Sequence, residues 1–510
     1  MSFGLISGSI MLRPHLIASA VCVAIACSVA GTPAPVAAAR LKIALIMPAA
    51  DSALSQPAQW AADGLIAANY ASKAPAAIIS VRPVQGASVI DQLNQAAKAG
   101  AVVAVGPLDR GGVEQLAAQP FLPIPVVTLN QVPLNNEIAE TEIAPEPEPV
   151  ALTPGAYAPE ANRSVWQRAR SEERPAPSGH ILANTNVEGF VKAEDIPRKH
   201  IRKEPKRFPR ELLMMGLSME NEAEYVTGLA VKALPERTAS GEKPKVLLLD
   251  HATPLEKRIS DAFLESLQQA GFAPDRMTVD HANLEPVHKM FSLTLTGKDA
   301  RFPEELIDRK EDPVGYAQQQ LRMKKYFAER RAEVAFAEPP YAAIFLAMGS
   351  ETASLIYPRL PSRSRVWATS AIYPGDPNTE PEAKSMCYDL QNIGFAGSPF
   401  VLGYDRDSFE KRYRIMPISG VLQKRLFALG SDALKVAVEM AKGTTRYSFK
   451  GENGTISFDR DEAPAVSITP TPAMIGPGVI KLMKEKDLIE FNVIDLYGAP
   501  RQKKTAESAR

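Results

Sequence analysis

Cysteine is scarce in this chain, and most of it lies at one end. Of the three cysteines in 510 residues, Cys22 and Cys27 fall in an amino-terminal apolar region, and only Cys387 falls in the part expected to fold. A single cysteine excludes an intrachain disulfide in that part. Because no histidine lies near Cys387 in sequence, we interpret it as a small buried apolar residue rather than a nucleophile.

The chain also lacks a charge imbalance and a long apolar run. Its 58 basic and 58 acidic residues give a formal net charge of +0, which gives no reason to expect a nucleic-acid partner. The apolar run at residues 16–26 is too short to be read as a membrane-spanning helix. A chain of this length is instead expected to form two or more folded units.

Motifs of common catalytic sites are missing as well. The sequence contains no H-E-x-x-H pair, no G-x-S-x-G elbow and no Walker loop. His251, His281 and His288 do not have the spacing of zinc ligands. No pair of carboxylates stands out as a general acid and base. We therefore predict no catalysis, no metal and no cofactor.

The amino terminus has the pattern of a secretory signal. Arg13 and His15 precede the apolar run, and residues 37–39 offer three small residues for cleavage just before the first predicted strand. The sequence Ala-Ile-Ala-Cys ending at Cys27 also resembles an imperfect bacterial lipobox, so Cys27 is a lipidation candidate. We expect residues 1–39 to be a signal peptide and the mature chain to be exported to the periplasm, either free or anchored to the outer membrane by lipid.

Two series of apolar runs separated by amphipathic segments predict βαβ units. The first series predicts strands at residues 41–47, 77–84, 102–105 and 126–129. The second predicts strands at residues 212–217, 245–250, 277–279, 342–347 and 365–369. Such apolar, β-branched runs are typical of parallel sheets covered on both faces. We predict an α/β protein with two lobes, each a parallel β-sheet flanked by helices.

The segment between the two series has a different composition. Residues 133–210 hold 11 of the 43 prolines, open with acidic residues and close with basic ones, so we predict a disordered insertion. We assign residues 40–132 and 372–442 to lobe 1, residues 211–371 and 443–490 to lobe 2, and residues 491–510 to a flexible tail. Residues 392–395 are predicted as a strand returning to lobe 1. Residues 454–458 and 466–468 are predicted to pair antiparallel.

Several stretches, taken together and in order, carry a family resemblance. They are IALIMPAADS, VVAVGPLDRGGVEQLAA, PIPVVTLNQ, MMGLSMENEAEYV, AAIFLAMGSETASLIYPRL, RVWATSAIYPGD, GFAGSPFVLG, LFALGSDALKVA and GTISFDRD. The set resembles the carboxy-terminal domain of penicillin-binding protein activators of the LpoA/LppC kind, which have the type I periplasmic-binding-protein fold. The resemblance covers residues 40–461 outside the insertion. It implies a regulator at the outer membrane that binds a class A penicillin-binding protein and stimulates peptidoglycan synthesis.

In binding proteins of this fold, a small-molecule ligand lies between the lobes against loops that follow strands. The candidate residues here are Asp51, Ser52, Gly106, Pro107, Asn130, Ser218, Ser350, Ser370 and Tyr373. Hydroxyls and free backbone N–H groups would suit a carboxylate or amide, but the same residue types more commonly cap helices and build turns. The alternative function is a solute-binding receptor of an amino-acid-type ABC transporter. The apolar loops at residues 49–50 and 252–255 favour the regulator.

Overall fold

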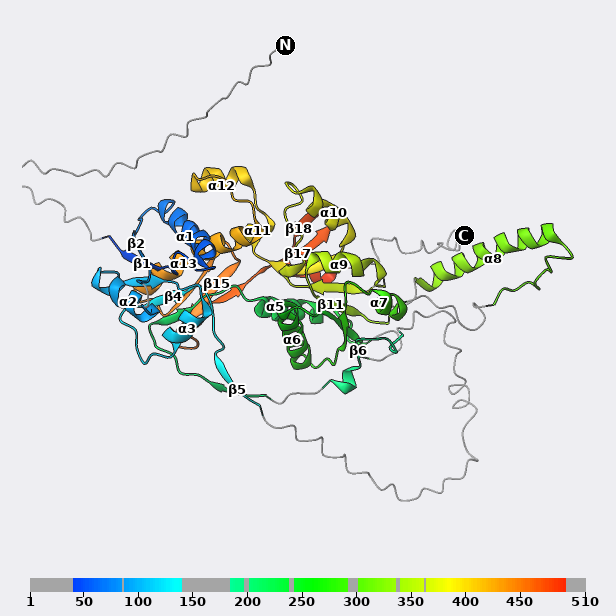
Figure 1. The fold of residues 1–510 in the computed structure, drawn as a ribbon, viewed down its shortest axis with the longest axis horizontal. Helices are drawn as coiled ribbons and strands as arrows, with labels where there is room; N and C mark the ends of the chain where they lie inside the picture. Colours follow the sequence, from blue (N-terminus) through cyan, green and yellow to red (C-terminus); the bar gives the residue numbers. More distant parts are fainter. Residues whose placement is uncertain are drawn as a thin grey trace, which may run out of the picture. The chain divides into compact units, whose positions relative to one another are not determined.

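The computed structural model describes residues 40–84, 87–139, 184–196, 201–237, 243–291, 301–335, 340–361 and 364–491. From Leu41 onward the chain forms one compact unit. The predicted signal peptide with Cys27, and residues 492–510 of the predicted tail, lie outside the described residues. Figure 1 colours the chain by sequence, so that strands from early and late parts of the chain can be followed into their sheets.

The first sheet is parallel throughout, as predicted for lobe 1. Its strand order is β2-β1-β3-β4-β8. The strands are β1 (Lys42–Ile46), β2 (Ala77–Val81), β3 (Val103–Val105), β4 (Val126–Thr128) and β8 (Leu212–Met214). The helices that connect β1 to β4 are α1 (Ser55–Tyr70), α2 (Val89–Lys98) and α3 (Arg110–Ala117). Ser88 and Asp109 cap α2 and α3 through their side-chain oxygens, which fixes where each helix starts.

The strand β8 belongs to this first sheet, which corrects its assignment to lobe 2. It pairs in parallel with β4, with Val127 opposite Leu213. Leu213 and Met215 pack in the same core as Ile43 and Val105. The insertion between β4 and β8 hid this pairing, because neighbours in the sheet are separated by some eighty residues of sequence.

The second sheet is larger and mixed, whereas the prediction was a parallel sheet. Its strand order is β18-β17-β13-β12-β11-β9-β10-β6, and only β9 to β13 run parallel to one another. The strands are β6 (Phe190–Val191), β9 (Val246–His251), β10 (Asp275–Val279), β11 (Ala343–Ala347), β12 (Arg365–Ala368), β13 (Ile393–Gly397), β17 (Thr471–Gly476) and β18 (Val479–Leu482). The helices that accompany it are α5 (Met219–Ala233), α6 (Pro254–Gln269), α7 (Glu285–Met290), α9 (Ser350–Ile356), α10 (Pro381–Asp389) and α14 (Glu485–Glu490).

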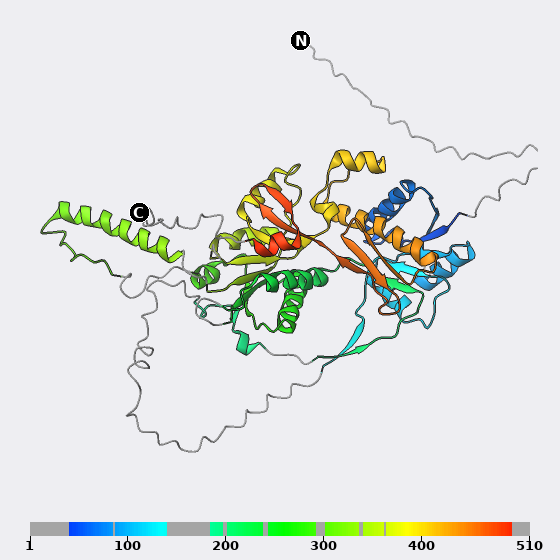
Figure 2. The same cartoon turned by 180° about the vertical axis from the view of Figure 1, so that it is seen from behind.

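The strand β13 lies in this second sheet, so the prediction that it returns to lobe 1 is wrong. It pairs in parallel with β12 and antiparallel with β17. The helix α10 makes the crossover between β12 and β13, as expected for neighbouring parallel strands. Figures 1 and 2 show the late strands β17 and β18 beside the earlier strands of the same sheet.

The return to the first sheet is made further on, by the helix α13 (Val421–Ala441), after the short helices α11 (Pro399–Leu402) and α12 (Arg406–Tyr413). The helix α13 packs along α1, and Leu429, Ala433 and Val436 join the core of the first sheet. Two glycines allow the close approach. A Cβ on Gly64 would lie 1.9 Å from the Phe427 carbonyl oxygen, and one on Gly430 would lie 1.8 Å from that of Ala61.

A small three-stranded sheet follows α13. The strands are β14 (Arg446–Lys450), β15 (Thr455–Asp459) and β16 (Ser467–Thr469). The predicted antiparallel pair is confirmed, with Ile456 opposite Ile468. Ile456, Phe458 and Val466 are buried in the core of the first sheet, so the predicted boundary that placed residues 443–469 in lobe 2 is corrected. Only β17 and β18 of that predicted segment enter the second sheet.

The described parts of the predicted insertion contain secondary structure, which corrects the prediction of disorder for them. The strands β5 (Asn135–Ala139) and β7 (Ile201–Pro205) pair antiparallel. The strand β6 is paired with β10 at an edge of the second sheet, and a 3-10 turn, η2, spans Ala193–Asp195. Residues 140–183 and 197–200 lie outside the described residues, so the prediction for them stays untested. The helix α8 spans Pro313–Ala335.

Candidate functional site

The candidates that follow β1 build a turn. Asp51 is exposed, and the Ser52 hydroxyl accepts a hydrogen bond of 3.2 Å from the Leu54 amide, directly before α1 begins at Ser55. The Ser52 amide also donates to the Ala49 carbonyl at 3.1 Å. Both residues are accounted for by the entry into α1.

The candidates after β3 and β4 hold two loops together. Gly106 has φ of +103°, and a Cβ there would lie 2.5 Å from the Ile46 carbonyl oxygen, so this position requires glycine. The Pro107 carbonyl accepts a hydrogen bond from the Leu129 amide at 3.0 Å. The Asn130 side chain donates to the Leu108 carbonyl at 2.9 Å. These residues fix the backbone at the carboxyl edge of the first sheet.

Two candidates at the second sheet also have local roles. Ser350 is the first residue of α9 and is partly exposed. Tyr373 is buried against the core of the second sheet, and this burial raises the pKa of its hydroxyl, with nearby Asp376 and Glu380 adding to the shift. Neither side chain is among the residues that line the cavity described next.

Ser218 and Ser370 are the two candidates that the structure brings together with charged groups. The Ser370 amide donates to the Glu222 carboxylate at 2.9 Å, and its hydroxyl also donates to Glu222. The Arg425 guanidinium in turn donates to the Ser370 hydroxyl. Ser218 caps α5 by accepting from the Asn221 amide at 3.1 Å, one turn before Glu222. The result is a chain from Arg425 through Ser370 to Glu222.

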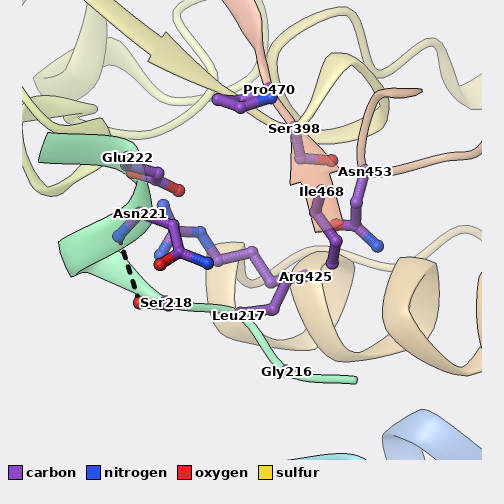
Figure 3. A pocket seen from close by; sticks show the side chains of 10 residues that line it. All are labelled: Gly216, Leu217, Ser218, Asn221, Glu222, Ser398, Arg425, Asn453, Ile468 and Pro470. Carbon is purple, nitrogen blue, oxygen red and sulfur yellow. Dashed lines mark hydrogen bonds between the residues drawn. The ribbon is translucent and has the colours of Figure 1, made fainter. Parts of the chain in front are cut away.

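This network borders a small cavity, shown in Figure 3. Its volume is about 30 Å³, which is room for about one water molecule. The lining residues come from segments that connect the two sheets, and they are Gly216, Leu217, Ser218, Asn221, Glu222, Ser398, Arg425, Asn453, Ile468 and Pro470. Arg425 extends from α13 toward Asn221 and Glu222 on α5.

Asn453 contributes an unsatisfied polar atom to this cavity. The residue is 2% exposed, and its Oδ1 atom has no hydrogen-bond partner among the described residues. Its amide nitrogen donates to the Asp432 carboxylate at 3.1 Å, and the backbone amides of Glu452 and Asn453 donate to the same carboxylate. A water in the cavity would supply the missing donor to Oδ1.

Glu222 and Arg425 are partly buried, whereas the neighbouring Lys424 and Asp376 are almost fully buried. Burial of Glu222 raises the pKa of its carboxyl, although Arg425 and the hydrogen bonds from Ser370 act in the opposite direction. Next to Arg425, the ammonium of Lys424 lies 3.8 Å from the Asp376 carboxylate and 4.3 Å from the centre of the Tyr404 ring. Burial lowers the pKa of Lys424, while Asp376 opposes this shift. Two adjacent cations of α13 therefore hold carboxylate or hydroxyl groups of the second-sheet region.

Sequence reasoning missed Glu222, Arg425 and Asn453. Glu222 lies in the first turn of α5, where an acidic residue is commonly accounted for by the helix dipole. The available signal was the pair Lys424-Arg425, which directly precedes the long apolar stretch of α13. Adjacent cations at the start of a buried helix require partners, and the structure supplies Asp376 and Ser370.

A second, larger cavity of about 340 Å³ lies beside α11 and α12. Its lining includes the aromatic side chains of Phe400, Tyr404, Phe409 and Tyr413. Arg412 forms an ion pair with Glu452 at 2.5 Å on the same wall, and Glu452 also accepts from the Tyr413 hydroxyl at 3.1 Å. The ring faces of Tyr404 and Tyr413 are already in contact with Lys424 and Arg412.

The histidines form a hydrogen-bonded chain rather than a metal site. His251 Nδ1 lies 2.8 Å from the Glu256 carboxylate, and its Nε2 lies 3.0 Å from Nδ1 of His281. The ring centroids are 5.2 Å apart, the separation of two imidazoles joined in line by one hydrogen bond. Within the described parts of the chain, no group of three or more His, Cys, Asp or Glu is placed to hold a metal ion.

None of the helices that the structure describes within residues 40–491 is both long enough and apolar enough to cross a membrane.

The two-sheet architecture, with connecting segments that meet at the cavity, is that of a type I periplasmic-binding-protein fold. Among solved structures, a protein of Chromobacterium violaceum assigned to a branched-chain amino acid ABC transporter matches with a TM-score of 0.50 and 19% identity, over 85% of this chain and 100% of that one. Full-length LpoA of Haemophilus influenzae matches with a TM-score of 0.50 and 15% identity, over 87% of this chain and 59% of LpoA. No family model matches the sequence, and no curated protein matches it.

Proposed function

We propose that this chain is a non-catalytic regulator that binds a class A penicillin-binding protein and raises its output of peptidoglycan. The nine sequence stretches that resemble LpoA-type activators support this, as does the fold shared with LpoA of Haemophilus influenzae. The amino-terminal pattern supports export to the periplasm, with lipidation at Cys27 as the route to the outer membrane.

The observation that carries the proposal is the small volume left between the two sheets. A solute receptor requires a cavity that surrounds its ligand, and pockets for small molecules usually measure about 300 Å³ or more. Here the cavity that the Arg425–Ser370–Glu222 network borders measures about 30 Å³. A cavity this small favours a protein whose own side chains connect the two lobes. It does not favour a receptor whose lobes close around an amino acid.

The alternative is a receptor of an amino-acid-type ABC transporter. It is favoured by the match to the Chromobacterium violaceum protein, which is covered over its whole length. In that function, Arg425 and the amino terminus of α5 would hold a ligand carboxylate after the lobes separate.

The physical requirement for activation is modest. A regulator that binds the active state of a synthase more tightly than the inactive state shifts the population between them. A tenfold shift requires a difference in binding free energy of about 1.4 kcal/mol. An interface of ordinary size supplies this without any chemical step by the regulator.

The test pairs a synthase assay with calorimetry on the exported full chain. We expect saturable binding to a class A synthase of the same cell, with an increase in glycan polymerisation or cross-linking. A panel of free amino acids should give no heat of binding. Tight binding of one amino acid, together with no effect on any class A synthase of that cell, would contradict the proposal and support the receptor function.

A further inference from the structure

The helix α8 is attached through one face to the segment that precedes it. Gln319 is 1% exposed, accepts from the Ile307 amide at 2.9 Å and donates to the Glu305 carbonyl at 2.6 Å. Arg322 forms an ion pair with Glu304 at 3.0 Å. The ring of Phe302 packs against those of Tyr326 and Phe327. One side of α8, light green in Figure 1, is therefore satisfied by residues 302–307.

A different side of α8 is exposed and carries an ordered set of apolar residues. Val314, Ala317, Leu321 and Ala328 are spaced by three, four and seven residues, which places them along one stripe of the helix. Val314 and Leu321 are each 68% exposed. Leu306, in the preceding segment, is also exposed.

Two lysines border this stripe. Lys324 and Lys325 follow Leu321 by three and four residues, so they lie beside it, one on each side of the stripe. Both are exposed, and Lys325 makes a long contact of 3.9 Å with the exposed Glu329. We call Val314, Ala317, Leu321, Lys324, Lys325 and Ala328 the α8 face.

We propose that the α8 face binds a groove on a partner protein, with apolar side chains on the floor of the groove and carboxylates along its rim. An amphipathic helix that presents apolar residues at this spacing is a recurring way of filling such a groove. The two lysines determine the sign of the rim, because cations at the border of an apolar contact pair with carboxylates. This inference rests on the proposed function, which makes the class A synthase the partner.

A lipid surface fits the same face poorly. Helices that lie on membranes commonly present Trp, Phe and several Leu, whereas the apolar part of this stripe is one Val, one Leu and two Ala.

The test compares two triple variants of the full chain that change charge by the same amount. The α8 variant is Leu321→Glu/Lys324→Glu/Lys325→Glu. The control is Met416→Glu/Arg406→Glu/Lys411→Glu, at exposed positions on and after α12. We expect the α8 variant to bind the synthase at least tenfold more weakly and to stimulate it correspondingly less, with an unchanged melting temperature. The control should stay within twofold of the wild type.

The outcomes separate this inference from the proposed function. Wild-type affinity in the α8 variant, or an equal loss in the control, overturns docking through α8 and leaves the proposed function standing. Absence of binding by the wild type to every class A synthase of the cell overturns the proposed function, and with it this choice of partner. Binding of the wild type to vesicles of phosphatidylglycerol, lost in the α8 variant, overturns the protein groove in favour of lipid.

Discussion

The helices α5 and α13 each supply one of the two charged residues that line the cavity. The two helices differ in how closely their neighbours pack against them. Each contains a glycine within its length, Gly228 in α5 and Gly430 in α13. A Cβ on Gly430 would lie 1.8 Å from the Ala61 carbonyl oxygen, whereas one on Gly228 would meet nothing within 4 Å. The same residue type is therefore required by helix packing in α13 and carries no packing role in α5.

The two helices also differ in how deeply they bury charged residues. On α5, Glu220 pairs with the exposed Arg258 near the surface. On α13, Lys424 and Asp432 are both almost fully buried, and their partners are buried too. Buried charges are costly to leave without partners, so α13 fixes the positions of Asp376 and of the turn at residues 451–453.

The largest effect is expected from Gly430→Ala. The added methyl group requires α1 and α13 to move apart over their contact, which would open the core that contains Leu429 and Ala433. Overpacking typically costs about 1–3 kcal/mol and occasionally more, and a Cβ 1.8 Å from a backbone oxygen belongs at the upper end or above. The gain in helix propensity from Gly to Ala returns about 1 kcal/mol. We therefore expect a net loss of about 2 kcal/mol or more in urea unfolding. A change within 0.5 kcal/mol would show that the helices adjust freely, and the contrast with α5 would disappear.

A pH-dependent effect is expected from Asp432→Asn, and its net size is smaller because lost hydrogen bonding in the variant partly offsets the gain described below. Burial raises the pKa of Asp432 from 3.8 to about 6, although three N–H groups donate to its carboxylate. The folded state therefore binds the proton more tightly than the unfolded state, and the free energy of unfolding falls as pH rises from about 4 to about 6. The shift corresponds to an energy on the order of 3 kcal/mol.

The asparagine variant lacks this titration, so it should gain stability relative to the wild type as pH rises through that window. Its amide also loses acceptor capacity toward the turn, which lowers its stability at every pH by a constant amount. Urea unfolding between pH 4 and pH 7 gives the difference between the two proteins. Parallel profiles across this range would mean that Asp432 is ionised throughout, and that its hydrogen bonds outweigh burial.

The features that could be predicted from sequence are those that depend on residues close together in the chain. Apolar runs at residues 41–47 and 245–250 predicted strands, because a strand of this kind depends on neighbours in sequence. The membership of β8 and β13 in their sheets was wrong, because pairing depends on partners far along the chain. The sequence of a buried parallel strand does not indicate which other strand it pairs with.

The candidate site shows the same limit. Residue types at strand ends identified Ser218 and Ser370, which do lie at the network. Gly106 and Asn130 were drawn from the same pattern but stabilise loops, since turn formation uses the same residues as ligand binding. Arg425 was not selected because it lies on a helix 55 residues after Ser370, and its contact arises only when α13 packs against the segments that connect the sheets.

The smallest effect, and the one of opposite sign, is expected from Gly228→Ala. This glycine lies in the interior of α5 and is exposed, and a Cβ there has open space around it. Alanine restricts the unfolded chain and has the higher helix propensity, so we expect stabilisation by about 0.5–1 kcal/mol in urea unfolding. Combined with Gly430→Ala, the two changes should add, because they lie on different helices with no shared contact. Destabilisation by Gly228→Ala would mean that a partner surface or an undescribed segment covers this side of α5, and the helix would then resemble α13 after all.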